Sequence, residues 1–371
     1  MAIGQIPVID ADVHIHELDS DLAPYFAMPW RRAIEEGGMA RQGARSVKGE
    51  RFLDYPGYSP LTIYDPILGD LPGEPHQITS PEILRNDMDQ RGVDAAVIYT
   101  GRLLQAATSK DYHYIVALTQ AYNRCLAERW LDPSRGIYGA IMVANQAPEE
   151  AADEITQDAK VPGFVAVYLP SAGNYPLWGD RSYDPIFAAA QEADLPVVLQ
   201  GALTVHTVFP YELHHLPTAL AKQTLSQAFG ALANLVNMIT TGTFSRFPRL
   251  KVVFNDAGIA WLPLALGRLD HYYPFLRDET PSLKDRPSAY IRRQVYLATH
   301  PIDCPNNPAF LATCLEAIGL DHLIFGSDWP HFDATETQRI LNLPLQDEAK
   351  HGILSGNARR LFRISDPALT R

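Results

Sequence analysis

The chain has 371 residues, of which 46% are hydrophobic and 20% are charged, a composition typical of a packed globular protein. Its 43 acidic residues outnumber 31 basic ones, and no local basic patch offsets the net charge of −12, so we expect no nucleic-acid partner. No stretch approaches the ~20 apolar residues of a membrane helix and the first residues lack a signal-peptide pattern, so we expect a cytoplasmic protein without a membrane partner.

The predicted strands are short runs rich in β-branched residues, and they alternate along the chain with helical patterns. In chain order they are 7–16, 95–99, 136–143, 163–169, 196–200, 250–255, 294–299 and 322–327. The predicted helices between them are 81–91, 110–130, 183–194, 216–245 and 307–319. The first of these helices has Ser80 as its N-cap and Pro81 at its first position, which is a typical start signal.

Eight strands with intervening helices predict an α/β protein with one (β/α)8 barrel, or TIM barrel, over residues 1–371. An open doubly wound sheet is the alternative that the pattern leaves. Two segments interrupt the alternation. Residues 17–80 form a long insertion after the first strand, rich in Pro, Gly and Tyr, and we expect it to cover the pocket. Residues 203–216 follow the fifth strand and carry three histidines.

Ionisable residues recur at every second position of the first predicted strand. Because side chains alternate between the two faces of a strand, Asp10, Asp12, His14 and His16 share one face. In a barrel of this class the active site lies at the carboxyl ends of the strands. Further acids and histidines follow three other strands, namely Asn255 and Asp256 after the sixth, His300 after the seventh and Ser327 and Asp328 after the eighth.

This pattern indicates metal chemistry. Two histidines at i and i+2 point the same way, so His14 and His16 can hold one divalent ion, with a carboxylate such as Asp328 completing an open coordination sphere. A bound ion of this kind lowers the pKa of its water to about 7 and polarises a carbonyl group. We expect zinc, with manganese or iron as alternatives.

The sequence resembles the amidohydrolase-related family of metal-dependent hydrolases, also called the amidohydrolase 2 family, over nearly its whole length. The resemblance rests on "DVHIH" (12–16), "LPVVLQG" (195–201), "RFPRLKVVFNDAGIAWLP" (246–263), "FGSDWPHFD" (325–333) and "ILSGNARRLFRI" (353–364). It implies a (β/α)8 barrel that binds a divalent metal and acts as a hydrolase or decarboxylase on a small carboxylate or carbonyl compound.

The resemblance also implies roles for individual residues. The family's first-strand pattern falls on Asp12, His14 and His16, where some members bind metal through the two histidines and others through the acid and the first histidine. The last-strand acid, a metal ligand and sometimes a base, falls on Asp328. Asp256 matches a histidine or glutamate that serves relatives as a general base or supports the ligands. We expect Asp328 to activate water or donate a proton, and Asp256 or His300 to act as a second acid/base or substrate contact.

One position departs from the family pattern. Relatives typically have a metal-binding histidine after the fifth strand, where this sequence has Gln200, a weak and neutral oxygen donor. The missing ligand must then come from elsewhere. His206, in the loop that follows, is our candidate replacement, and His214, His215 and His300 are further possibilities.

Some of these residues also have structural interpretations. Asp256 is alternatively the cap of the helix that begins near Ile259, which needs an acceptor at its start. Loop histidines are easily hydrated, so His331 and the histidines of 203–216 are interpreted as surface or structural residues. Asp10 is expected to lie buried behind the ligands and to orient them.

Two other functions fit the same sequence. Certain relatives are oxygen-activating hydroxylases with a two-metal iron or manganese site. Some of these are paired-subunit enzymes, such as aminoisobutyrate hydroxylase. The chain is therefore alternatively a subunit of such an enzyme. Gln200 also fits a low-activity scaffold that stabilises a catalytic paralogue. In each case we expect a small-molecule substrate site and an oligomer, either of identical chains or with a paralogous subunit.

Overall fold

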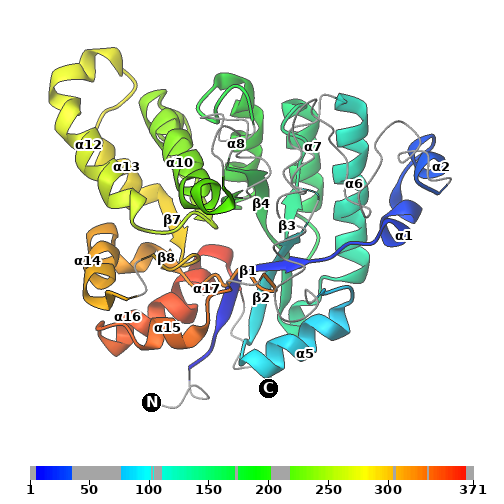
Figure 1. The fold of residues 1–371 in the computed structure, drawn as a ribbon. Coiled ribbons are helices and arrows are strands. Elements are labelled where there is room, and N and C mark those ends of the chain that lie inside the picture. Colours follow the sequence, from blue (N-terminus) through cyan, green and yellow to red (C-terminus); the bar gives the residue numbers. More distant parts are fainter. Residues whose placement is uncertain are drawn as a thin grey trace.

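The computed structural model of the chain describes residues 6–35, 77–101, 103, 111–171, 174–201, 218–303, 306–331 and 334–364. Within these residues, eight parallel strands follow one another in sequence order around a barrel (Figure 1). The strands are β1 (Ile9–Ile15), β2 (Ala95–Thr100), β3 (Ile137–Met142), β4 (Phe164–Pro170), β5 (Val197–Gln200), β6 (Val252–Asn255), β7 (Val295–Ala298) and β8 (Leu323–Ile324). All eight predicted strands are therefore confirmed. The sequential order excludes the doubly wound alternative, in which the strand order reverses.

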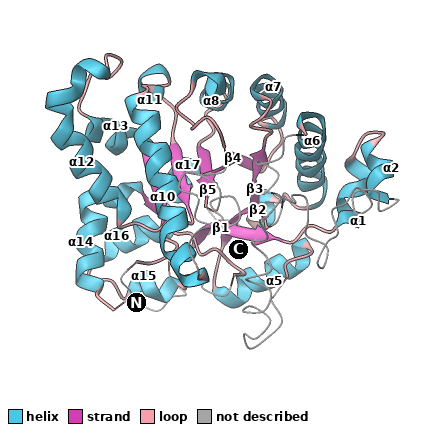
Figure 2. Ribbon diagram, turned by 45° about the horizontal axis from the view of Figure 1, so that its top comes forward, coloured by secondary structure: helices cyan, strands magenta, loops and turns pink. Residues whose placement is uncertain are grey.

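Helices surround the strands on the outside of the barrel (Figure 2). They are α1 (Asp19–Leu22), α2 (Trp30–Glu35), α5 (Pro81–Arg91), α6 (Tyr112–Arg129), α7 (Pro148–Asp158), α8 (Asp184–Glu192), α10 (Ala219–Thr240), α11 (Thr243–Arg246), α12 (Trp261–Leu276), α13 (Pro287–Gln294), α14 (Pro308–Ile318), α15 (Thr337–Leu341), α16 (Asp347–His351) and α17 (Asn357–Phe362). The cap predicted for α5 is confirmed, because Ser80 Oγ accepts from the backbone N–H of Ile83 at 3.3 Å. Sequence reasoning missed α7, although Pro148 at its first position is an ordinary start signal.

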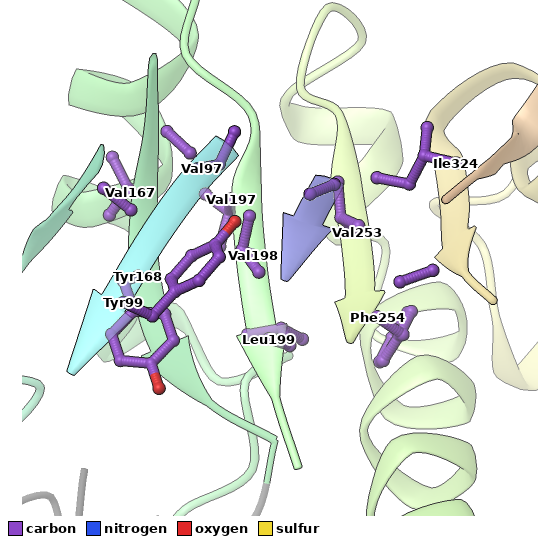
Figure 3. Packing of buried hydrophobic residues seen from close by; sticks show 14 of the residues in the cluster. Val97, Tyr99, Val167, Tyr168, Val197, Val198, Leu199, Val253, Phe254 and Ile324 are labelled. Atoms are coloured by element: carbon purple, nitrogen blue, oxygen red, sulfur yellow. The ribbon is translucent and has the colours of Figure 1, made fainter. Parts of the chain in front are cut away.

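Strand side chains fill the barrel. Val97, Tyr168 and Val198 are at most 1% exposed, and Figure 3 shows them among the neighbouring strands. The outer face of each strand is buried as well, because the helices cover it. This explains why runs such as 196–199 are apolar without alternation, as is usual for parallel strands.

The chain that follows β8 closes the barrel against β1. The backbone N–H groups of Ala11 and His14 donate to the carbonyls of Phe325 and Trp329 at 2.8 and 2.7 Å, and that of Asp328 donates to the carbonyl of Asp12 at 2.9 Å. A Cβ atom on Gly326 would lie 3.0 Å from the Cβ of Asp12, so glycine is what permits this close approach. Closure thus places Asp328 directly beside β1.

Asp10 fixes the turn after β8 from behind. It is fully buried, and its carboxylate accepts from the backbone N–H of Ser327 at 2.9 Å and from the Ser327 hydroxyl at 2.6 Å. Arg91 Nη1 lies 3.3 Å from the same carboxylate, and the Arg91 guanidinium stacks 4.5 Å from the ring centre of Trp329. Because Ser327 and Trp329 flank Asp328, this network orients that residue. The supporting role predicted for Asp10 fits this geometry.

The insertion predicted at 17–80 begins and ends at one place, because the backbone N–H of His16 donates to the carbonyl of Ile78 at 2.8 Å. The structure describes only its two ends, 17–35 and 77–80, and the predicted cover otherwise lies outside the described residues. Residues 203–216 also lie outside them. Among the helices that are described, none has the length and apolar character needed to cross a membrane.

A polar cluster joins α6 and α7 to β3 beneath the surface. Glu154 accepts from Asn123 Nδ2 at 2.7 Å and from Thr119 Oγ1 at 3.2 Å. Asn123 also pairs with the backbone of Met142, donating to its carbonyl at 2.8 Å and accepting from its N–H at 2.9 Å. Burial, followed by the charge of Asp158, raises the pKa of Glu154 to about 8, although the hydrogen bonds from Asn123 and Thr119 oppose this rise.

We predict that Glu154→Gln flattens the pH dependence of stability. Since the pKa of Glu154 rises from 4.5 to about 8 on folding, the folded protein binds more protons than the unfolded chain between these values. The free energy of unfolding should therefore fall as pH rises through this window, by up to about 1.4 kcal/mol per pH unit, and the variant should lose that slope. Urea denaturation across the window measures it, with the exposed Glu149→Gln as control. Identical profiles for wild type and Glu154→Gln would contradict the prediction.

We also predict that Asp10→Ala destabilises the barrel closure. The change leaves Arg91, whose side chain is 11% exposed, without its carboxylate, and a buried pair broken in this way costs about 3 kcal/mol or more. Asp89→Ala is the matched control. It removes a carboxylate that pairs with Arg85 but is 65% exposed, so it should cost less than about 1 kcal/mol. Chemical denaturation compares the two, and equal losses would refute the role given to Asp10.

Candidate metal and catalytic site

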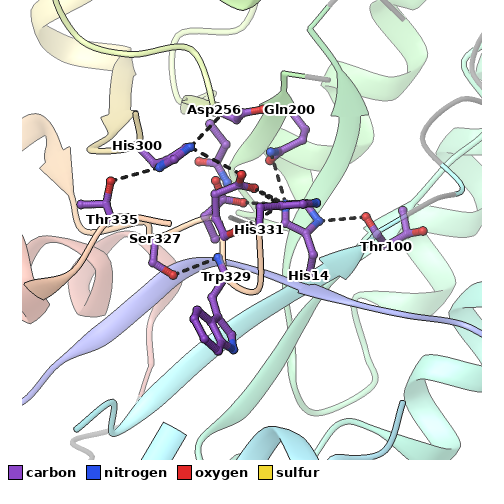
Figure 4. A network of polar contacts seen from close by, with 12 residues as sticks. His14, Thr100, Gln200, Asp256, His300, Ser327, Trp329, His331 and Thr335 are labelled. Carbon is purple, nitrogen blue, oxygen red and sulfur yellow. Dashed lines mark hydrogen bonds and ion pairs between the residues drawn. The ribbon is translucent and has the colours of Figure 1, made fainter. Parts of the chain in front are cut away.

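Polar side chains converge where the carboxyl ends of β1, β5, β6, β7 and β8 meet (Figure 4). They are Asp12 and His14 on β1, Gln200 on β5, Asp256 after β6, His300 after β7 and Asp328 after β8. Each of these six residues is at most 7% exposed. Parallel strands end at the same edge of a barrel, which is why residues so far apart in the sequence meet here.

His14 presents one ring nitrogen to the centre. Its Nδ1 lies 3.0 Å from the carbonyl of Thr100, which can only accept, so Nδ1 donates and Nε2 of the neutral ring keeps its lone pair. Nε2 lies 3.1 Å from Asp328 Oδ1 and 3.3 Å from Asp12 Oδ1. Burial lowers the pKa of His14, but Asp12 and Asp328 outweigh it and raise that pKa well above 6.5. The carboxylates thus attract positive charge to this position, as a proton or as a cation.

Asp328 lies at the middle of the cluster. Its Oδ1 is 3.1 Å from His14 Nε2 and 3.0 Å from His331 Nδ1, whereas its Oδ2 is 3.4 Å from His300 Nε2. Burial by itself would raise the pKa of Asp328, but His331 and His14 hold it well below its ordinary value. Asp328 therefore stays a carboxylate. Its φ of 61° lies in the left-handed region, which aspartate tolerates better than most residues.

Asp256 and His300 lie on the other side of Asp328. His300 Nε2 is 3.7 Å from Asp256 Oδ1, and His300 Nδ1 is 3.0 Å from the hydroxyl of Thr335. Gln227 Nε2 donates to Asp256 Oδ2 at 3.0 Å. Asp256 also has a left-handed backbone, with φ of 49°.

Asp256 was considered above as the cap of the helix that begins near Ile259, but a different residue accepts from the backbone N–H groups there. Asp303 Oδ2 accepts from the backbone N–H groups of Ile259 and Ala260 at 2.6 and 2.9 Å. A capping carboxylate is thus supplied from the loop after β7. Asp256 is turned instead toward His300 and Gln227.

His331 reaches the site from the turn after β8. Its side chain is 47% exposed, yet its Nδ1 lies 3.0 Å from Asp328 Oδ1. The charge of Asp328 raises the pKa of His331 against the opposing effect of burial. The surface or structural interpretation of this histidine therefore misses its contact with the centre. Its place in "GSDWPH", three residues after Asp328, was the signal available in the sequence.

The donor set fits a divalent cation. Among the described residues, no hydrogen-bond donor reaches either carboxylate oxygen of Asp12 or the amide oxygen of Gln200, all of which are buried, and this is costly unless something else compensates them. Two groups of residues bring three potential ligand atoms within 4.8 Å of one another: His14, Asp328 and His331, and Asp256, His300 and Asp328. Carboxylates and imidazoles in this arrangement suit Mn²⁺, Fe²⁺ or Zn²⁺.

Not all predicted ligands join these groups. Neither three-residue group contains Asp12 or His16, although Asp12 lies within 3.3 Å of His14. His16 follows the end of β1 and is partly buried, and its role as a ligand stays a prediction. His206 lies outside the described residues, as do His214 and His215.

Several supporting residues could not be found from the sequence. The carbonyl of Thr100 and the side chains of Thr335, Gln227 and Arg91 hold the site residues in place. They lie on β2, in the loop after β8, on α10 and on α5. Such residues carry no motif, since any polar atom at the right point in space serves.

Comparison with known proteins places these observations in a family. A family model described as "Amidohydrolase" matches residues 9–364. The chain is 23% identical over 289 residues to gamma-resorcylate decarboxylase of Polaromonas sp., covering 75% of this chain and 86% of that protein.

Solved structures resemble the fold over its whole length. The 5-carboxyvanillate decarboxylase LigW of Sphingomonas paucimobilis superposes with a TM-score of 0.71 at 21% identity, covering 97% of this chain and 100% of that one. The 5-carboxyvanillate decarboxylase of Novosphingobium aromaticivorans, in complex with manganese and 4-hydroxy-3-methoxy-5-nitrobenzoic acid, gives a TM-score of 0.71 at 20% identity, covering 97% of each chain. The ion in that complex is manganese, so it lends no support to the zinc expected from the sequence.

The structural likeness confirms the (β/α)8 barrel, and the family resemblance read from the sequence motifs is confirmed by the match over residues 9–364. The chain belongs to the amidohydrolase family that this match defines.

Proposed function

We propose that the chain is a metal-dependent decarboxylase of a small aromatic carboxylic acid, a carbon–carbon lyase of the amidohydrolase family. The observation that carries the proposal is the buried meeting of His14 Nε2, Asp328 Oδ1 and the carboxylate of Asp12, whose oxygens accept no hydrogen bond from the described residues. The relatives support the choice of reaction, because gamma-resorcylate and 5-carboxyvanillate decarboxylases are both among them.

His14, Asp328 and Asp12 are the residues that would hold the cation. When bound, a divalent cation supplies a positive charge that stabilises the negative charge of the acid and of its neighbouring oxygens. Manganese is the ion we propose, since a set rich in carboxylates suits it and solved relatives contain it. Thr100 orients the His14 ring through Nδ1, and the Asp10 network orients Asp328.

Decarboxylation also needs a proton at the ring carbon that loses CO2. His331 is placed to carry it, because its imidazole is half-exposed to solvent and also contacts Asp328 Oδ1. Asp328 holds that imidazole by its Nδ1, which leaves the other ring nitrogen for proton exchange.

The test is CO2 release from a panel of hydroxylated benzoic acids by protein loaded with Mn²⁺. 2,6-Dihydroxybenzoate, 5-carboxyvanillate and 6-methylsalicylate form the first panel, with amides of the same acids to detect hydrolysis instead. Metal-dependent CO2 release supports the proposal. Hydrolysis of the amides alone, or turnover that survives removal of all metal, would refute it. Wild-type protein that neither binds metal nor turns over would favour the scaffold alternative.

We predict that His14→Ala and Asp328→Ala each abolish metal binding and turnover while the barrel stays folded. Each change removes a ligand atom, and loss of a catalytic cation is expected to lower the rate by several orders of magnitude. Metal content by elemental analysis, CO2 release and circular dichroism are measured together. His113→Ala, on the exposed start of α6, is the control. Full activity in either site variant would reject the assignment.

We predict that Gln200→His raises metal affinity. Gln200 Nε2 lies 3.5 Å from His14 Nε2, so an imidazole at this position lies beside the cation position, and it is a far better ligand than an amide. The affinity for Mn²⁺ should increase about tenfold or more, which is about 1.4 kcal/mol. Competition with a fluorescent chelator measures this change. Unchanged or weaker binding would mean that the side chain at 200 does not face the cation.

A further inference from the structure

Two tyrosines face the interior of the barrel beside the candidate site. Tyr99 pairs directly with His14 across β1 and β2. Tyr168 lies two residues before Pro170, which pairs with Gln200 across β4 and β5. Directly paired residues on neighbouring strands point to the same face, and so do residues two positions apart on one strand. Both phenol rings therefore point inward, on the face that carries His14 and Gln200.

The two phenol rings pack against each other inside the barrel (Figure 3). Their centroids lie 4.9 Å apart, and the centroid of the Tyr99 ring lies 6.1 Å from that of the His14 ring. Each tyrosine is only 1% exposed. Tyr168 is thus held in place by a ring that itself lies beside a proposed ligand of the cation.

Neither phenol hydroxyl has a hydrogen-bond partner among the described residues. A buried polar group of this kind is costly unless a bound molecule satisfies it. Burial, followed by the charge of Asp12, raises the pKa of both Tyr99 and Tyr168 well above 10. Both phenols therefore stay protonated, and each can donate a hydrogen bond.

The neighbours of the two hydroxyls differ. After burial and Asp12, the pKa of Tyr99 responds to Asn255, which lies across the barrel on β6. The pKa of Tyr168 responds instead to residues that include Glu17, which follows the end of β1. The Tyr168 hydroxyl thus lies toward the carboxyl ends of the strands, where the candidate site is.

We propose that Tyr168 is a substrate-binding residue, whose hydroxyl donates a hydrogen bond to an oxygen of the aromatic acid held at the cation position of His14 and Asp12. The inference rests on the proposed function and adds to it a residue that recognises the acid. Asp12 itself is not the acceptor, because its oxygens accept no hydrogen bond from the described residues. An acid bound beside Asp12 brings carboxylate oxygens that can only accept, which is what an O–H donor at this place needs.

The test is the affinity of the Mn²⁺-loaded full chain for salicylate and for benzoate, measured by isothermal titration calorimetry. We expect Tyr168→Phe to weaken salicylate binding about tenfold or more, because it removes one hydrogen bond and leaves the ring in place. A loss for both acids identifies the carboxylate as the acceptor, and a loss for salicylate alone identifies its hydroxyl group. Either result supports the proposal, and the affinity for Mn²⁺ should stay unchanged.

Two other phenols provide matched controls. Tyr99→Phe removes an equally buried hydroxyl that has different neighbours, so both affinities should stay unchanged. Tyr183→Phe removes a buried hydroxyl that donates to the carbonyl of Pro176 at 3.0 Å, in the segment between β4 and α8. It should lower stability toward urea and leave both affinities unchanged. Tyr168→Phe should not lower the stability of the metal-free chain, because its hydroxyl has no partner among the described residues.

The outcomes separate this proposal from the decarboxylase function. Equal affinities of wild type and Tyr168→Phe for both acids overturn it, since the hydroxyl would then hold no more than a water molecule. An equal loss in Tyr99→Phe also overturns it, because the pair of rings and not one hydroxyl would set the affinity. A chain that releases no CO2 but binds salicylate through Tyr168 refutes the reaction and supports the contact. A wild type that binds neither acid overturns both.

Discussion

The rest of the site depends on one buried carboxylate, that of Asp328, held where the end of the barrel meets its beginning. Removing such a group from water is costly, and the cost is met by histidines that approach it from two sides. His14 approaches from the first strand, and His300 follows the seventh. The negative charges of Asp328 and Asp12 thus attract positive charge to the position of His14 Nε2.

Closure of the barrel and assembly of the centre are the same structural event. The backbone hydrogen bonds between β1 and the segment after β8 join residues that are more than 300 positions apart in the sequence. The same contact places Asp10 against Ser327 and Asp12 near Asp328. This polar centre needs both ends of the barrel, because its residues come from β1 and from the turn after β8.

The chemistry of the centre differs from the family pattern in its balance of donors. Where relatives typically offer an imidazole after the fifth strand, this chain has the neutral amide of Gln200. On the opposite side it has Asp256 where relatives carry histidine or glutamate. In the proposed metal centre, these oxygen donors would favour manganese or iron over zinc.

Sequence patterns by themselves predicted the barrel, and they singled out most of the polar residues that the structure brings together at its carboxyl end. Apolar runs at regular spacing fix eight strands, because each must be buried on both faces, and the alternation in "DVHIH" places Asp12 and His14 on one face of β1. The family motifs identified Asp328 and Asp256 as site residues in the same way.

Tertiary structure alone decided which of these residues meet. It placed His331 against Asp328, assigned an acceptor role at the start of α12 to Asp303, and left His16 outside both three-residue groups. It also supplied the Thr100 carbonyl, Thr335 and Gln227 as supports. The physical reason is that strand formation follows from local side-chain periodicity, whereas the meeting of two side chains depends on how distant turns are packed, and no local pattern records that packing.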